Sequence, residues 1–183
     1  MYYEIKTKRL LLRPLCINDF ETAHIYTTNK DLTRYMMFLP HTTEEETKSF
    51  LKNATANWQQ NNPCQYEFAI TLHGKHIGGI SIEILDKAHQ KGMLSWILHP
   101  DYHGQGYMTE AASALVDFSQ RKIGLNECIA CCDARNAASA SVMKKIGMHL
   151  VNDTGSRTYP KTGEIAPELV YAITLSTEYT NSK

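Results

Sequence analysis

Two glycines, separated by one residue, stand where a short apolar segment meets an amphipathic one. Residues 93–98 have the length and apolarity of a strand, and from Ala111 on small and apolar residues recur at three- and four-residue steps, as in a helix. Gly104 and Gly106 carry no Cβ atom, so the backbone between these segments can bend sharply and expose its N–H groups. Such amides, together with the unpaired amides of a helix start, form an anion site. The spacing predicts a cradle for a pyrophosphate group.

A Gly-x-Gly turn by itself is equally compatible with a plain tight turn. No third glycine follows at the dinucleotide-binding spacing, and no Gly-Lys-Ser/Thr closes a nucleotide P-loop. The longer string Pro-Asp-Tyr-His-Gly-Gln-Gly-Tyr-Met-Thr-Glu-Ala, residues 100–111, is more informative. It resembles the acyl-CoA-binding loop of GNAT acetyltransferases, in particular the branch that includes the ribosomal-protein N-terminal acetyltransferases.

Two further strings resemble the same family and follow its order. Residues 7–14, Thr-Lys-Arg-Leu-Leu-Leu-Arg-Pro, are similar to the family's amino-terminal Thr-x-Arg-Leu-x-Leu-Arg-Pro stretch. Residues 135–139, Arg-Asn-Ala-Ala-Ser, are followed by Lys-Ile-Gly-Met, with Met148 where members usually have Phe. Together the three strings span most of the chain, which is identified as a member of the GNAT family.

The resemblance implies where acetyl-CoA, the expected co-substrate, would bind. The strand before the glycine loop would pair its backbone with the pantetheine arm, and the loop amides would hold the pyrophosphate. The Asn136 side chain would hold the arm, and Ser139 would lie near its sulphur. Asn136 also fits a plain helix cap. The implied binding residues are Trp96, Ile97, Leu98, Gly104, Gln105, Gly106, Tyr107, Met108, Thr109, Asn136 and Ser139.

Some charged or unusual positions around this site have more than one interpretation. His103 and Met108 depart from the commonest loop pattern, but they change the rim of a cradle that is built from backbone groups. The basic side chains next to Asn136 could meet the ribose phosphate or simply form a solvated charged face; they are Arg135, Lys144 and Lys145.

The implied reaction is direct attack of a primary amine on the acetyl thioester in a ternary complex. It needs an oxyanion donor, a base for the ammonium and an acid for the departing thiolate. Many members have a Glu and a Tyr for acid-base chemistry, but the matching positions here are Cys131 and Met143. Ser139 is the substitute donor to the thiolate that we expect, and Glu83 the base. Glu67, His99, His103 and water remain alternatives for the base.

The missing Glu favours an acceptor whose amine loses its proton easily. An α-amino group titrates near pH ~8 and a lysine near ~10.4, so freeing a lysine costs about 3 kcal/mol more at neutral pH. This difference favours a peptide amino terminus or another low-pKa amine on a small molecule. Of these, a protein or peptide amino terminus is the expected acceptor. Two alternatives stay open: a small-molecule acetyltransferase for a polyamine, amino acid or antibiotic, and a non-catalytic CoA-binding regulatory module.

Composition limits the other function classes. Nineteen basic and nineteen acidic side chains cancel, which gives no overall field for nucleic acid or an anionic membrane. No apolar run reaches the length of a membrane span, and five scattered cysteines suit a reducing, cytoplasmic setting. Cys128 and Cys131 lack a second ligand pair, so no metal is expected.

Members of this branch often form homodimers; monomer and homodimer both stay open.

Periodicity and turn residues predict one mixed α+β domain over residues 1–183, with a mostly antiparallel central sheet flanked by helices. The helices are expected at 18–26 from an Asn18 or Asp19 cap, at 43–58 from a Thr43 cap, from the glycine loop to 123, and at 137–146 before Gly147. The strands are expected at 8–15, 66–72, 80–84, 93–98, 127–133, 149–151 and 169–175, with a polar loop over 152–167.

Overall fold

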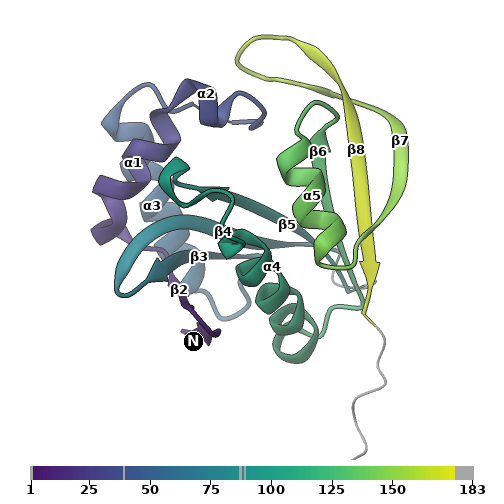
Figure 1. Cartoon of the computed structure of the whole chain (residues 1–183). Helices are drawn as coiled ribbons and strands as arrows, with labels where there is room; N and C mark the ends of the chain where they lie inside the picture. Colours follow the sequence, from purple (N-terminus) through teal and green to yellow (C-terminus); the bar gives the residue numbers. More distant parts are fainter. Residues whose placement is uncertain (1, 39, 87, 89, 176–183) are drawn as a thin grey trace, which may run out of the picture.

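A computed structural model describes residues 2–38, 40–86, 88 and 90–175. These residues form one eight-stranded sheet in the order β1-β2-β3-β4-β5-β6-β8-β7, with helices on its faces (Figure 1). The strands are β1 (Ile5–Lys6), β2 (Leu10–Pro14), β3 (Gln65–Leu72), β4 (Lys75–Asp86), β5 (Lys91–Leu98), β6 (Glu127–Asp133), β7 (His149–Thr158) and β8 (Ile165–Thr174). The α-helices are α1 (Phe20–Thr28), α2 (Lys30–Thr33), α3 (Glu44–Trp58), α4 (Tyr107–Phe118) and α5 (Ala137–Lys145). The predicted α+β architecture is confirmed.

The two faces of the sheet carry different helices because side chains alternate along each strand. One face packs Phe68 of β3 and Ile80 of β4 against Leu115 of α4 in the main core. The other face packs Ala69 of β3 into a second cluster with Tyr26 of α1. In Figure 1, α4 and α5 lie in front of the sheet, and α1 and α3 lie towards its β2 side.

The centre of the sheet divides at its only parallel pair among the described residues. β5 pairs with β6 at three positions alone, from Lys91 opposite Glu127 to Met93 opposite Ile129. Beyond them β5 continues beside β4 as far as Leu98, whereas β6 continues beside β8. The two strands therefore separate towards their carboxyl ends, and the loop that follows β5 leads into α4.

The predicted polar loop over residues 152–167 is wrong, because most of it belongs to the long β7–β8 hairpin. β7 is an edge strand with nearly every side chain exposed, so it shows no alternation of apolar and polar residues. Backbone pairing with β8 and contacts at the tip hold it in place. Lys161 Nζ donates to the Pro40 carbonyl at 2.5 Å, and Arg157 Nη1 donates to the Tyr35 carbonyl at 3.3 Å. The hairpin consequently reaches over to the segment after α2 (Figure 1).

One predicted helix cap is confirmed, and another is wrong. Thr43 Oγ1 accepts from the Glu46 N–H at 3.2 Å and caps α3 as predicted. Asp19 precedes α1 but makes no side-chain cap there. Its carboxylate binds the Arg13 guanidinium at 2.6 and 2.8 Å and the Cys16 N–H at 3.0 Å, and thereby closes a preceding 3-10 turn (Ile17–Asp19).

Candidate functional site

The glycine loop between β5 and α4 has the backbone that its sequence predicts. Gly104 and Gly106 have φ angles of +73° and +77°, a left-handed region that side chains with a Cβ rarely enter. Gly106 is the N-cap of α4, and the first intrahelical bond runs from Glu110 N–H to its carbonyl at 3.0 Å. The N–H groups between them have no partner within the helix, and the loop is exposed. This end of α4 can therefore hold an anion.

The loop is fastened to the start of β2 by Arg9. The backbone N–H and Nε of Arg9 donate to the Glu110 carboxylate at 2.8 and 2.6 Å, and its Nη1 donates to the Gln105 carbonyl at 3.0 Å. The guanidinium also lies over the Tyr107 ring, 4.4 Å from its centre. Burial pushes the pKa of Glu110 up, but hydrogen bonds from Thr7 and Arg9 outweigh it and hold that pKa below its usual value. Sequence reasoning missed this contact because its partners are remote in the chain.

The strand before the loop presents a free edge. β5 pairs only with β4 over Trp96, Ile97 and Leu98, since β6 has already moved away. Gly78 permits this pairing, because a Cβ there would approach the Ile97 carbonyl oxygen to 2.5 Å. The Leu98 carbonyl oxygen lies 2.8 Å from His103 Nε2. The other backbone groups on the free edge need hydrogen-bond partners, which an extended ligand lying in the opening can provide.

Asn136 and Ser139 lie at the start of α5, the helix that follows β6. Asn136 Oδ1 accepts from the Ser139 N–H at 3.1 Å, so Asn136 caps the helix. Both side chains are half-buried. The capping bond uses only the amide oxygen, and among the described residues no acceptor takes the Nδ2 protons of Asn136. The cap and a ligand-binding role are therefore compatible.

Asp133 fixes the turn that leads from β6 into α5. Its buried carboxylate accepts from the backbone N–H and side chain of Arg135 at 2.7 to 2.9 Å and from the Tyr159 hydroxyl at 2.7 Å. The Arg135 side chain, helped by Tyr159 and opposed by burial, holds the pKa of Asp133 well below its usual range. Arg135 also pairs with Glu164 at 2.9 Å, so its guanidinium is engaged within the protein.

The acid and base candidates occupy different environments. Met143 is buried in the core, and Cys131 is half-buried on β6, where burial raises the pKa of its thiol. Glu83 is exposed on β4, opposite Gln65 and Met93. Glu67 is half-buried on β3; burial, aided by the charge of Glu83 and opposed by a hydrogen bond from Ser81, raises its pKa to about 7. The assignment of Glu83 as the base stays a prediction. Because of its raised pKa, Glu67 is a stronger candidate for the base than the sequence indicates.

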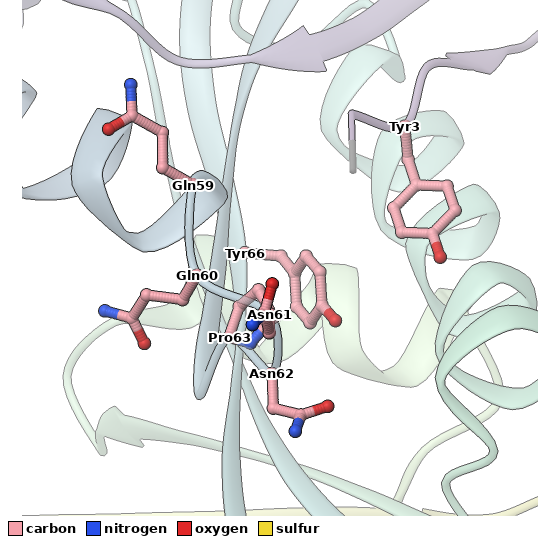
Figure 2. A pocket seen from close by; sticks show the side chains of 7 residues that line it. All are labelled: Tyr3, Gln59, Gln60, Asn61, Asn62, Pro63 and Tyr66. Atoms are coloured by element: carbon pink, nitrogen blue, oxygen red, sulfur yellow. The ribbon is translucent and has the colours of Figure 1, made fainter.

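Two surface cavities lie away from this opening. One, of about 370 Å³, is lined by Tyr3, Tyr66 and the polar turn after α3 (Figure 2). The other, of about 590 Å³, lies near Arg13 and Trp58. Neither is lined by the glycine loop or by α5. Within the part of the chain that the structure describes, no group of three or more His, Cys, Asp or Glu side chains is placed to hold a metal ion.

Known proteins share both this sequence pattern and this fold. The acetyltransferase (GNAT) domain model matches residues 9–149. The chain belongs to the GNAT acetyltransferase family. An uncharacterized N-acetyltransferase of Bacillus subtilis, YnaD, is 30% identical over 177 residues, which cover 92% of this chain and 95% of that protein. The GNAT assignment made from the three sequence strings is thus confirmed, and the protein is an acyl-CoA-dependent N-acetyltransferase by family.

GNAT proteins with different acceptors resemble this chain. The structure of RimL, a ribosomal L7/L12 alpha-N-protein acetyltransferase in complex with coenzyme A, has a TM-score of 0.84 and 20% identity, covering 94% of this chain and 98% of that one. The spermidine N(1)-acetyltransferase of Escherichia coli (strain K12) is 22% identical over 137 residues, which cover 74% of this chain and 70% of that protein. In the described part of this GNAT chain, no helix is long and apolar enough to cross a membrane.

Proposed function

We propose that this GNAT protein transfers the acetyl group of acetyl-CoA to the free amino terminus of a peptide or protein. The observation that carries the donor assignment is the separation of β5 from β6 beside the exposed amides of α4. An extended pantetheine arm would complete the free edge of β5, and its pyrophosphate would meet the amides from Gly104 to Thr109. Acetyl-CoA supplies an activated thioester, and the protein supplies alignment.

The residues of the chain have separate tasks in this proposal. Asn136 would orient the arm with its free amide N–H groups, and the Ser139 hydroxyl would donate a proton to the thiolate as the C–S bond breaks. Free N–H groups of β5 would donate hydrogen bonds to the thioester oxygen as it becomes negative. The amine must lose a proton before its lone pair can attack, and an α-amine needs the least help.

A polyamine is the second candidate acceptor, because two carboxylates, Glu67 and Glu83, lie on neighbouring strands and on the same face of the sheet. A polycationic substrate gains from such charges, whereas a peptide amino terminus needs only one of them. The relation to both RimL and the spermidine N(1)-acetyltransferase is compatible with either acceptor.

Thiol release from acetyl-CoA tests the proposal when it is measured with a panel of acceptors. The panel contains short peptides with different first residues, the same peptides with blocked amino termini, spermidine, and free amino acids. Turnover that depends on a free peptide amino terminus supports the proposal. Turnover with spermidine alone supports the polyamine reading. Saturable CoA binding without turnover on any amine indicates the regulatory module and contradicts the proposal.

A further inference from the structure

Three polar side chains form a row across β3, β4 and β5. Glu67 is opposite Ser81, and Ser81 is opposite Ser95, so all three point to one face of the sheet. Directly opposed residues have Cβ atoms about 5 Å apart, within reach of a hydrogen bond or a bridging water. Ser81 is buried and lies opposite Glu67, where its hydroxyl lowers the pKa of that carboxyl group, whereas Ser95 is exposed. The row thus joins a half-buried carboxyl group to solvent.

The exposed end of the row lies where the sheet divides. The last pair between β5 and β6 is Met93 opposite Ile129, and Ser95 is two residues further along on the same face of β5. The corresponding residue on β6 is Cys131, the position where other members carry an acid-base Glu. Ser95 therefore stands at the beginning of the opening in which the proposed function places the thioester.

The row contrasts with its surroundings on the sheet. On the opposite face, the neighbouring row of Phe68, Ile80 and Trp96 is apolar and packs into the main core under α4. A strand register that places a Glu and two Ser in line, with one Ser buried, leaves polar groups that need partners. Glu67 Oε1 accepts from Gln65 Nε2, two residues earlier on β3, at 2.7 Å, which holds one oxygen of the carboxyl group in place.

The charged and titratable groups around Glu67 come from several elements. Glu83 of β4 acts on it by its negative charge, and Tyr26 of α1 feels the charge of Glu67 in turn. The Tyr26 hydroxyl is buried and has no hydrogen-bond partner among the described residues. From α3, the Trp58 indole donates to the backbone carbonyl of Glu67 at 2.8 Å. Burial raises the pKa of Glu67 to about 7, a value suited to accepting a proton at neutral pH.

We propose that Glu67 is the proton acceptor for the incoming ammonium, which it reaches through Ser95 and Ser81. This inference rests on the proposed function. The ammonium gives one proton to Ser95, whose own proton passes to Ser81, and that of Ser81 passes to the Glu67 carboxylate. The freed lone pair forms the N–C bond to the thioester carbon. When the C–S bond breaks, the second nitrogen proton passes through the Ser139 hydroxyl to the CoA thiolate, and Glu67 releases its proton to solvent.

The pH dependence of kcat distinguishes this role from a structural one. Turnover of acetyl-CoA with spermidine and with an unblocked peptide is measured from about pH 5.5 to 9 at saturating substrates, for the wild type, Glu67→Gln, Ser81→Ala and the exposed control Glu21→Gln. We expect the wild-type kcat to rise through an apparent pKa of about 7. Glu67→Gln should lose this step and about 100-fold in kcat at pH 7, with the KM for acetyl-CoA within about twofold. The kcat of Ser81→Ala at pH 7 should lie between those of the wild type and Glu67→Gln. The kcat of Glu21→Gln should match that of the wild type.

The variant Glu83→Gln is an independent test. The negative charge of Glu83 raises the pKa of Glu67, so removal of that charge should move the step in kcat to lower pH while the step itself remains. A step that persists unchanged in Glu67→Gln overturns the proposal. So does a step that vanishes in Glu83→Gln alone, because Glu83 would then be the acceptor.

Titration of Glu67 itself needs no acceptor amine. Carbon-13 NMR of glutamate carboxyl groups, compared between the wild type and Glu67→Gln, assigns the Glu67 signal and follows it with pH. A midpoint near 7 supports the inference, and a midpoint near the usual value of about 4.3 overturns it. If no amine is acetylated, the proposed function fails, whereas the NMR midpoint still reports on Glu67 alone.

Discussion

Arg9 and Glu110, 101 residues apart in the chain, are joined by hydrogen bonds of 2.8 and 2.6 Å that connect the start of β2 to the first turn of α4. The same guanidinium reaches the Gln105 carbonyl inside the glycine loop. The loop that we propose as the pyrophosphate cradle is thus also held by a residue of the amino-terminal string. A preorganised loop binds its ligand more tightly because less conformational entropy is lost on binding.

Arg9→Gln should therefore weaken CoA binding more than it weakens the fold. We expect the Kd for CoA, measured by titration calorimetry, to rise about 10-fold, as for the loss of one or two charge-assisted hydrogen bonds. The free energy of unfolding should fall by less than about 1 kcal/mol, because the ion pair is partly exposed. Lys48→Gln is the control, since it removes the exposed Lys48–Glu44 pair of α3. Equal Kd values for Arg9→Gln and the wild type would show that the contacts of Arg9 with Glu110 and Gln105 do not organise the glycine loop for CoA binding.

Gly106→Val should abolish CoA binding and leave a cooperatively folded protein. At a φ of +77° a β-branched residue is strained, and its side chain would crowd the exposed amides. Gly163→Val is the matched control: its φ is +72°, a Cβ there meets nothing within 4 Å, and it lies in the β7–β8 turn. The two variants should lose similar amounts of unfolding free energy, about 1–2 kcal/mol. Calorimetry should detect CoA binding only in the control, and unchanged affinity in Gly106→Val would reject the pyrophosphate assignment.

Ser139→Ala should lower kcat and leave the affinity for CoA almost unchanged. Removal of a proton donor to the thiolate slows its departure by about 10²-fold or more, whereas the capping bond to Asn136 uses the backbone N–H of residue 139 and survives. Ser141→Ala, two residues further along the exposed part of α5, is the control. Steady-state kinetics on the best acceptor gives both constants, and a wild-type kcat in Ser139→Ala would remove Ser139 from the chemistry.

Asp133→Asn should destabilise the protein by about 2 kcal/mol, because a buried carboxylate loses its charge while Arg135 and Tyr159 keep their donors. The pKa of Asp133 is lowered in the fold, so its contribution is complete above the unfolded pKa of about 3.9 and is lost as pH falls towards the folded value.

Chemical denaturation at several pH values checks both parts of this prediction. The difference between wild type and Asp133→Asn should be constant near neutral pH and should shrink below about pH 4. Asp153→Asn, on the exposed edge strand β7, should change the unfolding free energy by less than about 0.5 kcal/mol. A pH-independent difference would mean that the Asp133 charge contributes nothing to stability.

The predictable parts of this molecule are those whose physics is local. The bend at Gly104 and Gly106 and the cap from Asn136 depend on residues within a few positions of each other, and both have the geometry that their strings predict. The Arg9–Glu110 ion pair and the row from Glu67 to Ser95 depend on strand register and on helix placement. Single residues far apart in the sequence carry no sign of such contacts.

The β7–β8 hairpin shows a second reason for failure. Residues 152–158 are polar and mostly exposed, and β7 pairs with β8 alone among the described strands. Neither apolar alternation nor a buried run therefore marks this strand in the sequence. Its stability comes from pairing with β8 and from tip contacts such as Lys161 to Pro40. A strand that contributes backbone more than side chains to the core is easily read as a loop.

The most direct measurement is a crystal structure of the protein with acetyl-CoA bound. We predict the pyrophosphate against the backbone amides from Gly104 to Thr109, the pantetheine arm along the free edge of β5, and the thioester between Ser139 and Ser95. Acetyl-CoA bound elsewhere, or an empty glycine loop at a saturating acetyl-CoA concentration, would contradict the pyrophosphate assignment and the proposed function with it.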